Sequence, residues 1–139
     1  MPELLADLEA FIMADDRIPP LIKIGLVHAQ FETIHPFIDG NGRMGRLFIT
    51  FYLCQKGILA RPLLYLSIYL KQHREEYYSL LQEIRIEGDW ESWLKFFLRG
   101  IIEVSKEALA NAREIITLKE RLTGTLVKVT SDQARGVYF

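Results

Sequence analysis

The chain has 139 residues, of which half are hydrophobic and a quarter are charged, a composition typical of one folded globular domain and not of a disordered chain. Its formal net charge of -1 provides no overall basic field that would draw it to nucleic acid or to an anionic membrane, so direct contact with either is not expected. The single cysteine, Cys54, has no partner for an internal disulfide, which suits a reducing compartment.

The start of the chain and its apolar runs indicate where the protein resides. Glu3, Asp7 and Glu9 fall where a secretory leader has a basic start followed by an apolar run. The longest apolar runs, residues 47–54 and 63–70, are far shorter than the roughly 20 residues that span a bilayer. These features predict a cytoplasmic protein.

Hydrophobic residues recur at three- and four-residue steps along almost the whole chain, and no Asn-Gly turn joins two alternating strands. This pattern predicts an all-α fold, a single-domain helical bundle. In chain order, an apolar stripe first predicts a helix over residues 2–15. Pro19 and Pro20 separate it from a second helix over residues 21–33, because proline suits the first turn of a helix and not its interior.

A third helix is expected from near Gly42 to Gly57, since a glycine at the end of a helix is typical of a left-handed cap. Residues 47–53 are apolar on nearly every side of this helix. A helix of that kind is normally buried from all directions. We therefore expect it to be the central helix of the bundle, surrounded by the others.

The connection at Arg61-Pro62 leads to a fourth predicted helix. Ser67 is a suitable N-cap, and the helical spacing of apolar residues continues from it to Ile86. Gly88 then provides the residue type that most often closes a helix. One continuous helix is therefore expected over residues 67–86.

The last long helix is expected to begin after Asp89, which is a favourable N-cap. Its apolar residues recur at three- and four-residue steps, but the pattern weakens after Thr123-Gly124. We therefore predict a core domain over residues 1–122. Residues 123–139 are predicted to be a short helix or a frayed tail.

The loop between the second and third helices, residues 34–46, has a composition that core packing does not explain. Gly40 and Gly42 allow backbone angles that other residues resist, so several N–H groups can point at one place. The loop leads into a helix N-terminus, whose unpaired N–H groups and dipole favour an anion. Arg43 and Arg46 lie three residues apart on one face of that helix, where two guanidinium groups suit several phosphate oxygens. The loop therefore predicts a polyphosphate site.

Two further side chains of this loop suit chemistry on a bound phosphate. Asp39 is a candidate ligand for Mg²⁺, which usually takes one or two carboxylates together with the substrate's phosphates. His35 is a candidate base, because imidazole is well suited to remove a proton from an attacking hydroxyl near neutral pH. Phe37 is expected to insert into the core and pin the loop. His28 and His73, in contrast, are predicted to be ordinary hydrogen-bonded residues.

Residues 35–46 have the sequence HPFIDGNGRMGR, which matches the signature HxFx(D/E)GNGRxxR at every defined position. This is the signature of the Fic domain family (Fic/DOC), and residues 28–34, 63–67 and 77–90 resemble the neighbouring helices of that family. The resemblance covers residues 2 to about 122. It implies a bundle of the Fic type, in which the catalytic loop precedes the central helix.

The resemblance also implies an activity, the transfer of AMP from ATP to a tyrosine, threonine or serine hydroxyl of a target protein. His35 would be the base, and Asp39 would place the cofactor Mg²⁺ on the phosphates. Asn41 and the amides of Gly40 and Gly42 would stabilise the charge that develops on the α-phosphate. The other positions implied to bind ATP are Arg43 at the β-phosphate, Arg46 at the γ-phosphate, Gly45, and Tyr77 and Tyr78 beside the adenine.

Several alternatives stay open at the level of the sequence. Gly42 occupies the position at which the kinase-like branch of the family has a lysine, so nucleotidyl transfer is favoured over phosphate transfer. Transfer of UMP, GMP or phosphocholine, an ATP-binding regulatory module without transferase activity, and a plain interaction bundle are the competing readings. The predicted partners are ATP and a hydroxyl-bearing target protein, and a homodimer is left open.

Two parts that often accompany the Fic domain are expected to be missing. The inhibitory motif (S/T)xxxE(G/N) has no match, since Glu83 and not a serine or threonine stands four residues before Glu87. The β-hairpin flap that normally precedes the first helix has no counterpart ahead of it. The resemblance therefore predicts a core without flap or inhibitor.

Overall fold

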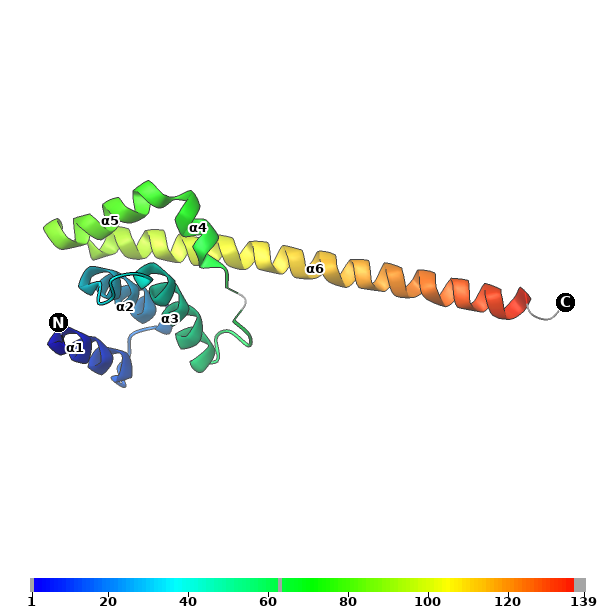
Figure 1. The fold of residues 1–139 in the computed structure, drawn as a ribbon, viewed down its shortest axis with the longest axis horizontal. Helices are drawn as coiled ribbons and strands as arrows, with labels where there is room; N and C mark the ends of the chain where they lie inside the picture. Colours follow the sequence, from blue (N-terminus) through cyan, green and yellow to red (C-terminus); the bar gives the residue numbers. More distant parts are fainter. Residues whose placement is uncertain (1, 63, 137–139) are drawn as a thin grey trace. The chain divides into compact units, whose positions relative to one another are not determined.

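The structure is a computed structural model that describes residues 2–62 and 64–136, with side chains as far as residue 127. Within this part the chain forms six helices and no strand, so the predicted all-α fold is confirmed (Figure 1). The helices are α1 (Pro2–Met13), α2 (Pro20–Ile34), α3 (Asn41–Gln55), α4 (Leu66–Gln72), α5 (Arg74–Glu87) and α6 (Trp90–Gly136). The chain divides into two compact units, Met1–Val104 and Ser105–Phe139, and the predicted boundary at residue 122 stays a prediction.

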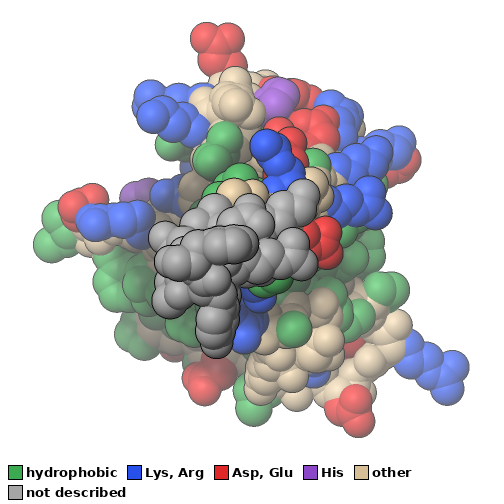
Figure 2. All heavy atoms as spheres, turned by 90° about the vertical axis from the view of Figure 1, so that its right-hand side faces the viewer, with side chains coloured by type: hydrophobic (Ala, Val, Ile, Leu, Met, Phe, Trp, Pro, Cys, Tyr) green, Lys and Arg blue, Asp and Glu red, His purple; other side chains and the backbone are tan. Residues whose placement is uncertain are grey.

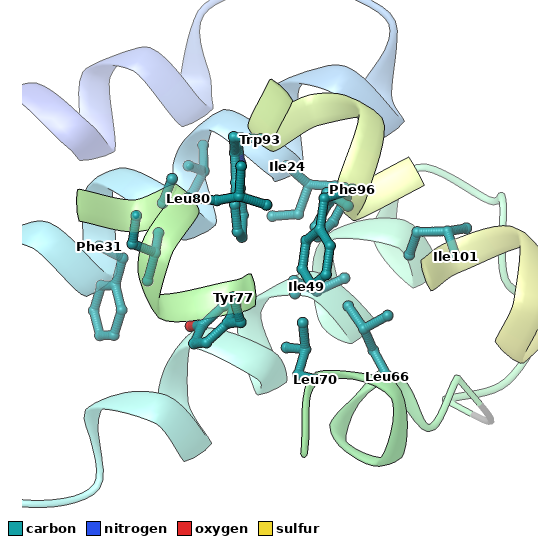
Figure 3. Close-up of a cluster of buried hydrophobic side chains, with 14 of the residues drawn as sticks. Ile24, Phe31, Ile49, Leu66, Leu70, Tyr77, Leu80, Trp93, Phe96 and Ile101 are labelled. Carbon is teal, nitrogen blue, oxygen red and sulfur yellow. The ribbon is translucent and has the colours of Figure 1, made fainter. Parts of the chain in front are cut away.

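The core of unit 1 is built around α2. This helix packs against α1, α3 and α5. Trp93, near the start of α6, is fully buried, and its indole N–H donates to the carbonyl oxygen of Gly25 at 2.9 Å. Figure 3 shows Trp93 and Phe96 among the aliphatic side chains of this core, with Tyr77 of α5 close by. The apolar stripes read from the sequence thus meet at α2.

Helix α3 buries one side only. Ile49, Tyr52 and Leu53 belong to the core, whereas Phe48 and Phe51 on another face are 40% and 58% exposed. The expectation that other helices surround this segment is therefore corrected, because part of its apolar surface faces solvent in the described structure. Apolar residues on every side of a helix do not by themselves show that every side is covered.

The predicted helix over residues 67–86 is two helices, because α4 ends and α5 begins at His73. The backbone of His73 has φ -107° and ψ 36°, outside the helical range. Its Nδ1 lies 3.0 Å from the carbonyl oxygen of Tyr69, and the two rings pack with their centroids 4.3 Å apart. No proline or glycine stands at this break, and the spacing of apolar residues continues across it. Neither feature therefore indicated that the helix is interrupted.

Helix α6 continues through Thr123-Gly124, where the sequence predicted a change. The hydroxyl of Thr123 donates to the carbonyl oxygen of Lys119, and that of Thr125 donates to the carbonyl oxygen of Arg121, both at 2.9 Å. Each hydroxyl bonds the carbonyl oxygen four residues earlier, as threonine does within a helix. The helix extends to Gly136 as one element.

Unit 2 consists of the part of α6 from Ser105 onward. Its large apolar side chains are exposed as far as they are described: Leu109, Ile115, Ile116, Leu118, Leu122, Leu126 and Val127. Neither this helix nor any other in the described part of the chain is long and apolar enough to cross a membrane. Figure 2 shows both basic and acidic side chains, as a net charge near zero leads one to expect.

Candidate active site

The loop between α2 and α3 is closed by the side chain of Asn41, which is buried. Its Oδ1 accepts a hydrogen bond from the backbone N–H of Phe37 at 2.9 Å, and its Nδ2 donates to the carbonyl oxygen of Phe37 at 2.6 Å. One amide group therefore satisfies both backbone groups of Phe37. Asn41 shapes the loop from within, and its implied contact with the α-phosphate stays a prediction.

Two residues of this loop have left-handed backbones. Gly40 has φ 86°, which glycine adopts without strain, and precedes the first turn of α3. His35 has φ 49° and caps the end of α2, where its N–H donates to the carbonyl oxygen of Phe31 at 3.0 Å. A side chain in this region costs of order 1 kcal/mol, and such residues cluster at functional sites. The imidazole of His35 is thereby turned out from the end of α2.

The prediction that Phe37 inserts into the core is wrong. Its side chain is 48% exposed, and its ring lies beside that of Phe31 with the centroids 6.3 Å apart. Ile38, the next residue, is fully exposed. The loop is held by the hydrogen bonds of Asn41 to the backbone and only secondarily by the ring of Phe37.

A cavity of about 630 Å³ opens beside this loop. Its size is that of a small-molecule site. It is bounded by the end of α2, the first turns of α3 and one face of α5. The residues that line it are Glu32, Thr33, His35, Gly42, Arg46, Tyr77, Tyr78, Leu81, Gln82 and Arg85. The structure thus brings together His35, Gly42 and Arg46 at one cavity.

The two arginines of α3 take different positions. The guanidinium Nη1 of Arg46 lies 3.0 Å from where a Cβ on Gly42 would be, so this group rests over the first turn of the helix. Arg43 pairs with Asp39 at 3.6 Å, with the two side chains 78% and 93% exposed. An ion pair this exposed contributes little to stability and is easily exchanged. Both arginines also line a smaller cavity of about 270 Å³.

Asp39 is the carboxylate that suits a magnesium ion in this loop. One of its oxygens accepts from the N–H of Gly40 at 2.7 Å, and the other faces Arg43. Among the described residues no cluster of three or more His, Cys, Asp or Glu side chains forms a ready-made metal site. Mg²⁺ bound with a nucleotide needs no such cluster, because phosphates and waters fill most of its coordination shell. Asp39, as a single exposed carboxylate of this loop, fits this mode.

The two tyrosines assigned to the adenine differ in position. Tyr77 is buried, with its ring centroid 5.9 Å from that of Trp93 and its hydroxyl oxygen 3.1 Å from Nε2 of His28. Burial, and next the nearby Glu32, raises the pKa of the Tyr77 hydroxyl, which keeps it protonated. Tyr78 is 56% exposed, and the guanidinium of Arg74 lies over its ring at 5.6 Å. Their contact with adenine stays a prediction.

A buried polar cluster beneath the cavity was not singled out by the sequence. His28 is completely buried, and burial lowers its pKa to about 4. Glu32, one turn later on α2, is 8% exposed, and burial raises the pKa of its carboxyl. His28 Nδ1 and Glu32 Oε1 are both buried without a hydrogen-bond partner. The available signal was the spacing of His28 and Glu32, four residues apart and therefore on one face of α2.

Gly45 makes room for this cluster. A Cβ at this position would lie 2.6 Å from Glu32 Oε1 and 3.1 Å from both Cε1 and Nδ1 of His28. Any larger residue would therefore push the two side chains aside. Gly45 is buried between α2 and α3, and the structure explains it by this close approach. Its implied part in binding ATP stays a prediction.

Comparison with known proteins shows what the chain resembles. Residues 1–53 match the model of the Fic/DOC family. The chain is 32% identical over 83 residues to a probable protein adenylyltransferase of Aquifex aeolicus (strain VF5), a match that covers 60% of this chain and 23% of that protein. It is 38% identical over 88 residues to protein adenylyltransferase Fic of Culex quinquefasciatus, which covers 63% of this chain and 15% of that protein.

A solved structure shows the same fold. The crystal structure of a Fic family protein from Desulfovibrio desulfuricans G20 matches with a TM-score of 0.72 at 32% sequence identity. The match covers 80% of this chain and 34% of that one. The chain thus spans less than a quarter of the length of the two curated relatives and about a third of the matched structure. The resemblance to the Fic/DOC family thus rests on the family model over residues 1–53 and on the fold shared with a solved Fic family protein.

Proposed function

We propose that this chain is the core of a protein adenylyltransferase, which transfers AMP from ATP to a hydroxyl group of a target protein. The observation that carries the proposal is the joint placement of His35, Gly42 and Arg46 on one cavity. A base, the N-terminus of a helix and a guanidinium group then face the same space. That set matches what nucleotidyl transfer requires, namely proton removal and stabilisation of phosphate charge.

In the proposed reaction His35 accepts the proton of the attacking hydroxyl. The hydroxyl oxygen forms a bond to the α-phosphorus, and the bond from this phosphorus to the oxygen of the β-phosphate breaks. Pyrophosphate leaves with the electron pair of that bond. The N–H groups at the start of α3, at Gly42 among others, stabilise the negative charge as it develops.

The remaining groups bind the rest of the nucleotide. Asp39 would hold Mg²⁺, which supplies positive charge to the phosphates. Arg43 exchanges its weak ion pair with Asp39 for a phosphate oxygen, and Arg46 reaches the terminal phosphate. The adenine of ATP is assigned to the side of the cavity that Tyr78 and Tyr77 line. The target is a protein with an accessible hydroxyl, and the proposed compartment is the cytoplasm.

The test is incorporation of labelled AMP from ATP and Mg²⁺, into the chain itself and into proteins of a mixed lysate. We expect label from ATP that carries the isotope in the α-phosphate and none from ATP that carries it in the γ-phosphate. His35→Ala should reduce incorporation about 10²- to 10⁴-fold, because a general base contributes a factor of this size. His73→Ala, a histidine outside the cavity, is the matched control and should retain activity.

Three outcomes would contradict the proposal. Equal labelling by wild type and His35→Ala would remove His35 as the base. Labelling from the γ-phosphate would indicate phosphate transfer. If ATP raises the melting temperature but no label is incorporated under any condition, the chain is a nucleotide-binding module without transferase activity.

A further inference from the structure

Two polar side chains of α2, His28 and Glu32, meet at Gly45 of α3, and Tyr77 of α5 contacts the same His28 ring. Tyr77 Oη lies 3.1 Å from His28 Nε2, so these two groups share one hydrogen bond. The other ring nitrogen, His28 Nδ1, and one carboxylate oxygen, Glu32 Oε1, are buried without a partner. Both of these atoms adjoin the same point, the position that a Cβ on Gly45 would occupy. Two costly unpaired atoms next to one another call for a common explanation.

One assignment of protons satisfies all three residues. His28 is neutral at pH 7, because burial lowers its pKa to about 4, and a neutral imidazole carries a single N–H. The protonated hydroxyl of Tyr77 donates to Nε2. The N–H of His28 is then on Nδ1, which faces Gly45 and Glu32 Oε1. A small approach of these side chains, or one bridging water, completes the chain from Tyr77 through His28 to Glu32.

This arrangement fixes one oxygen of Glu32 within the protein and leaves the other for the cavity. Glu32 and Arg46 line that cavity together; burial raises the pKa of the Glu32 carboxyl, and the positive charge of Arg46 opposes that shift. We propose that Glu32, held by His28 with its proton on Nδ1, is a positioning residue that aligns the Arg46 guanidinium for a phosphate group. The inference rests on the proposed function for the identity of the ligand.

The benefit of such a partner is preorganisation. An arginine side chain has many rotamers, and ordering it on binding costs affinity. A guanidinium has five N–H donors in a fixed plane, so one carboxylate occupies one edge and leaves donors for phosphate oxygens. The direct repulsion between Glu32 and the phosphates is offset by the guanidinium between them. Arg85 donates at 3.5 Å to the backbone oxygens of Glu32 and Thr33 and adds positive charge on the same side.

The first test measures dissociation constants of ATP and of AMP, each with Mg²⁺, for the full chain. Glu32→Gln keeps an oxygen that accepts from His28 and removes only the charge. We expect this variant to bind ATP about tenfold more weakly and AMP within twofold of wild type, since AMP lacks the phosphates that Arg46 reaches. In an Arg46→Ala background the same substitution should cause no further loss, because it acts through Arg46. Glu87→Gln, the same change at an exposed site of α5, is the control.

Several results would overturn the inference. One is ATP binding by Glu32→Gln that equals or exceeds wild type. Another is an equal loss for ATP and AMP, and a third is the same loss with and without Arg46, since both indicate general damage to the fold. Melting temperatures of all variants confirm that they are folded.

The second test needs no nucleotide and separates this inference from the proposed function. The ¹⁵N chemical shifts of the His28 imidazole show which nitrogen carries the proton. We expect Nδ1 to be protonated in wild type and in Glu32→Gln, and the pattern to change in Glu32→Ala. A proton on Nε2 in wild type would overturn the arrangement. If AMP transfer fails while this signature and the ATP-specific loss are found, only the proposed function falls.

Discussion

Two titratable side chains of α2 lie one turn apart and have pKa values shifted in opposite directions. Burial lowers the pKa of His28 to about 4, and burial raises the pKa of Glu32. In both cases the protein interior disfavours the charged form. The two groups therefore contribute to the pH dependence of stability with opposite signs.

His28 should make the protein less stable in mild acid. Its pKa in the folded state lies below the ordinary value of 6.5, so the unfolded chain binds a proton that the folded chain does not. The stability from neutral His28 is fully present above pH 6.5 and is lost as the pH falls towards 4. The complete loss amounts to roughly 3–3.5 kcal/mol. Urea unfolding of wild type and of His28→Gln at pH 7.5, 6.0 and 5.0 measures it.

The comparison with the variant isolates this one group. Protonation of Glu32 stabilises the folded protein, so this contribution to stability falls as the pH rises through the raised pKa of Glu32. The contribution of His28 changes with pH in the opposite direction. Asp16 and Asp89 have lowered pKa values, so their contributions to the stability of the protein are also lost in acid. Both residues are present in wild type and in the variant. Equal pH slopes for wild type and His28→Gln would show that His28 is not the cause.

The contact between helices α4 and α6 depends on a glycine. A Cβ on Gly100 of α6 would lie 2.5 Å from two ring carbons of Tyr69 of α4, which is itself buried. A second glycine in the same helix, Gly124, has no neighbouring atom within 4 Å of its Cβ position. The same substitution at the two positions therefore distinguishes the effect of helix propensity from the effect of packing.

Gly100→Ala should destabilise the protein by about 1–2 kcal/mol. Alanine is favoured over glycine within a helix by about 1 kcal/mol, but the clash with the Tyr69 ring costs more than that. Gly124→Ala has no clash to offset the same preference and should be neutral or stabilising by up to about 1 kcal/mol. Chemical denaturation of the two variants gives both values. A stabilised Gly100→Ala would mean that Tyr69 moves aside at little cost.

Residues with a strong local preference allowed the first three helices to be predicted. Pro19 and Pro20 marked the start of α2, and Gly57 marked the end of α3, to within a few residues. The break at His73 and the continuation of α6 through Gly124 were missed. At His73 no residue type marks a helix end, and at Gly124 a residue type that often ends a helix lies inside one.

The candidate site was predictable to a different extent. The residues of the loop were found because they are adjacent in sequence and of types that rarely occur together. The partnership of His28 with Tyr77 joins positions 49 residues apart, and nothing in the sequence pairs them. The bonds of Asn41 to Phe37 are local, but they depend on the left-handed turn at Gly40. Roles that require a specific fold of the loop or a contact across helices therefore emerged only with the structure.

At the scale of the whole molecule, the buried apolar residues lie in unit 1 as far as the chain is described. The last of them along α6 are Ile101 and Val104. From Ser105 onward the described side chains are exposed, apart from Ala108, which is partly buried. Unit 1 therefore contains a complete core in its own sequence.

A chain that ends after Val104 should fold on its own. Because no fully buried side chain is removed, we expect its melting temperature to lie within a few degrees of the full chain and its ATP affinity to be unchanged. A chain that ends after Gly100 loses two buried aliphatic side chains and should be less stable by several kcal/mol. Scanning calorimetry of the two truncations makes the comparison. Failure of the longer one to fold would show that unit 1 depends on residues beyond it.

The position of the tryptophans has a consequence for spectroscopy. The chain contains two, Trp90 and Trp93, and both lie in the first turn of α6 within unit 1. Trp93 is fully enclosed and bonded to Gly25, whereas Trp90 is partly buried. Indole fluorescence of this protein therefore reports the opening of the core beneath the cavity. Changes confined to the residues after Val104 leave that emission unaltered.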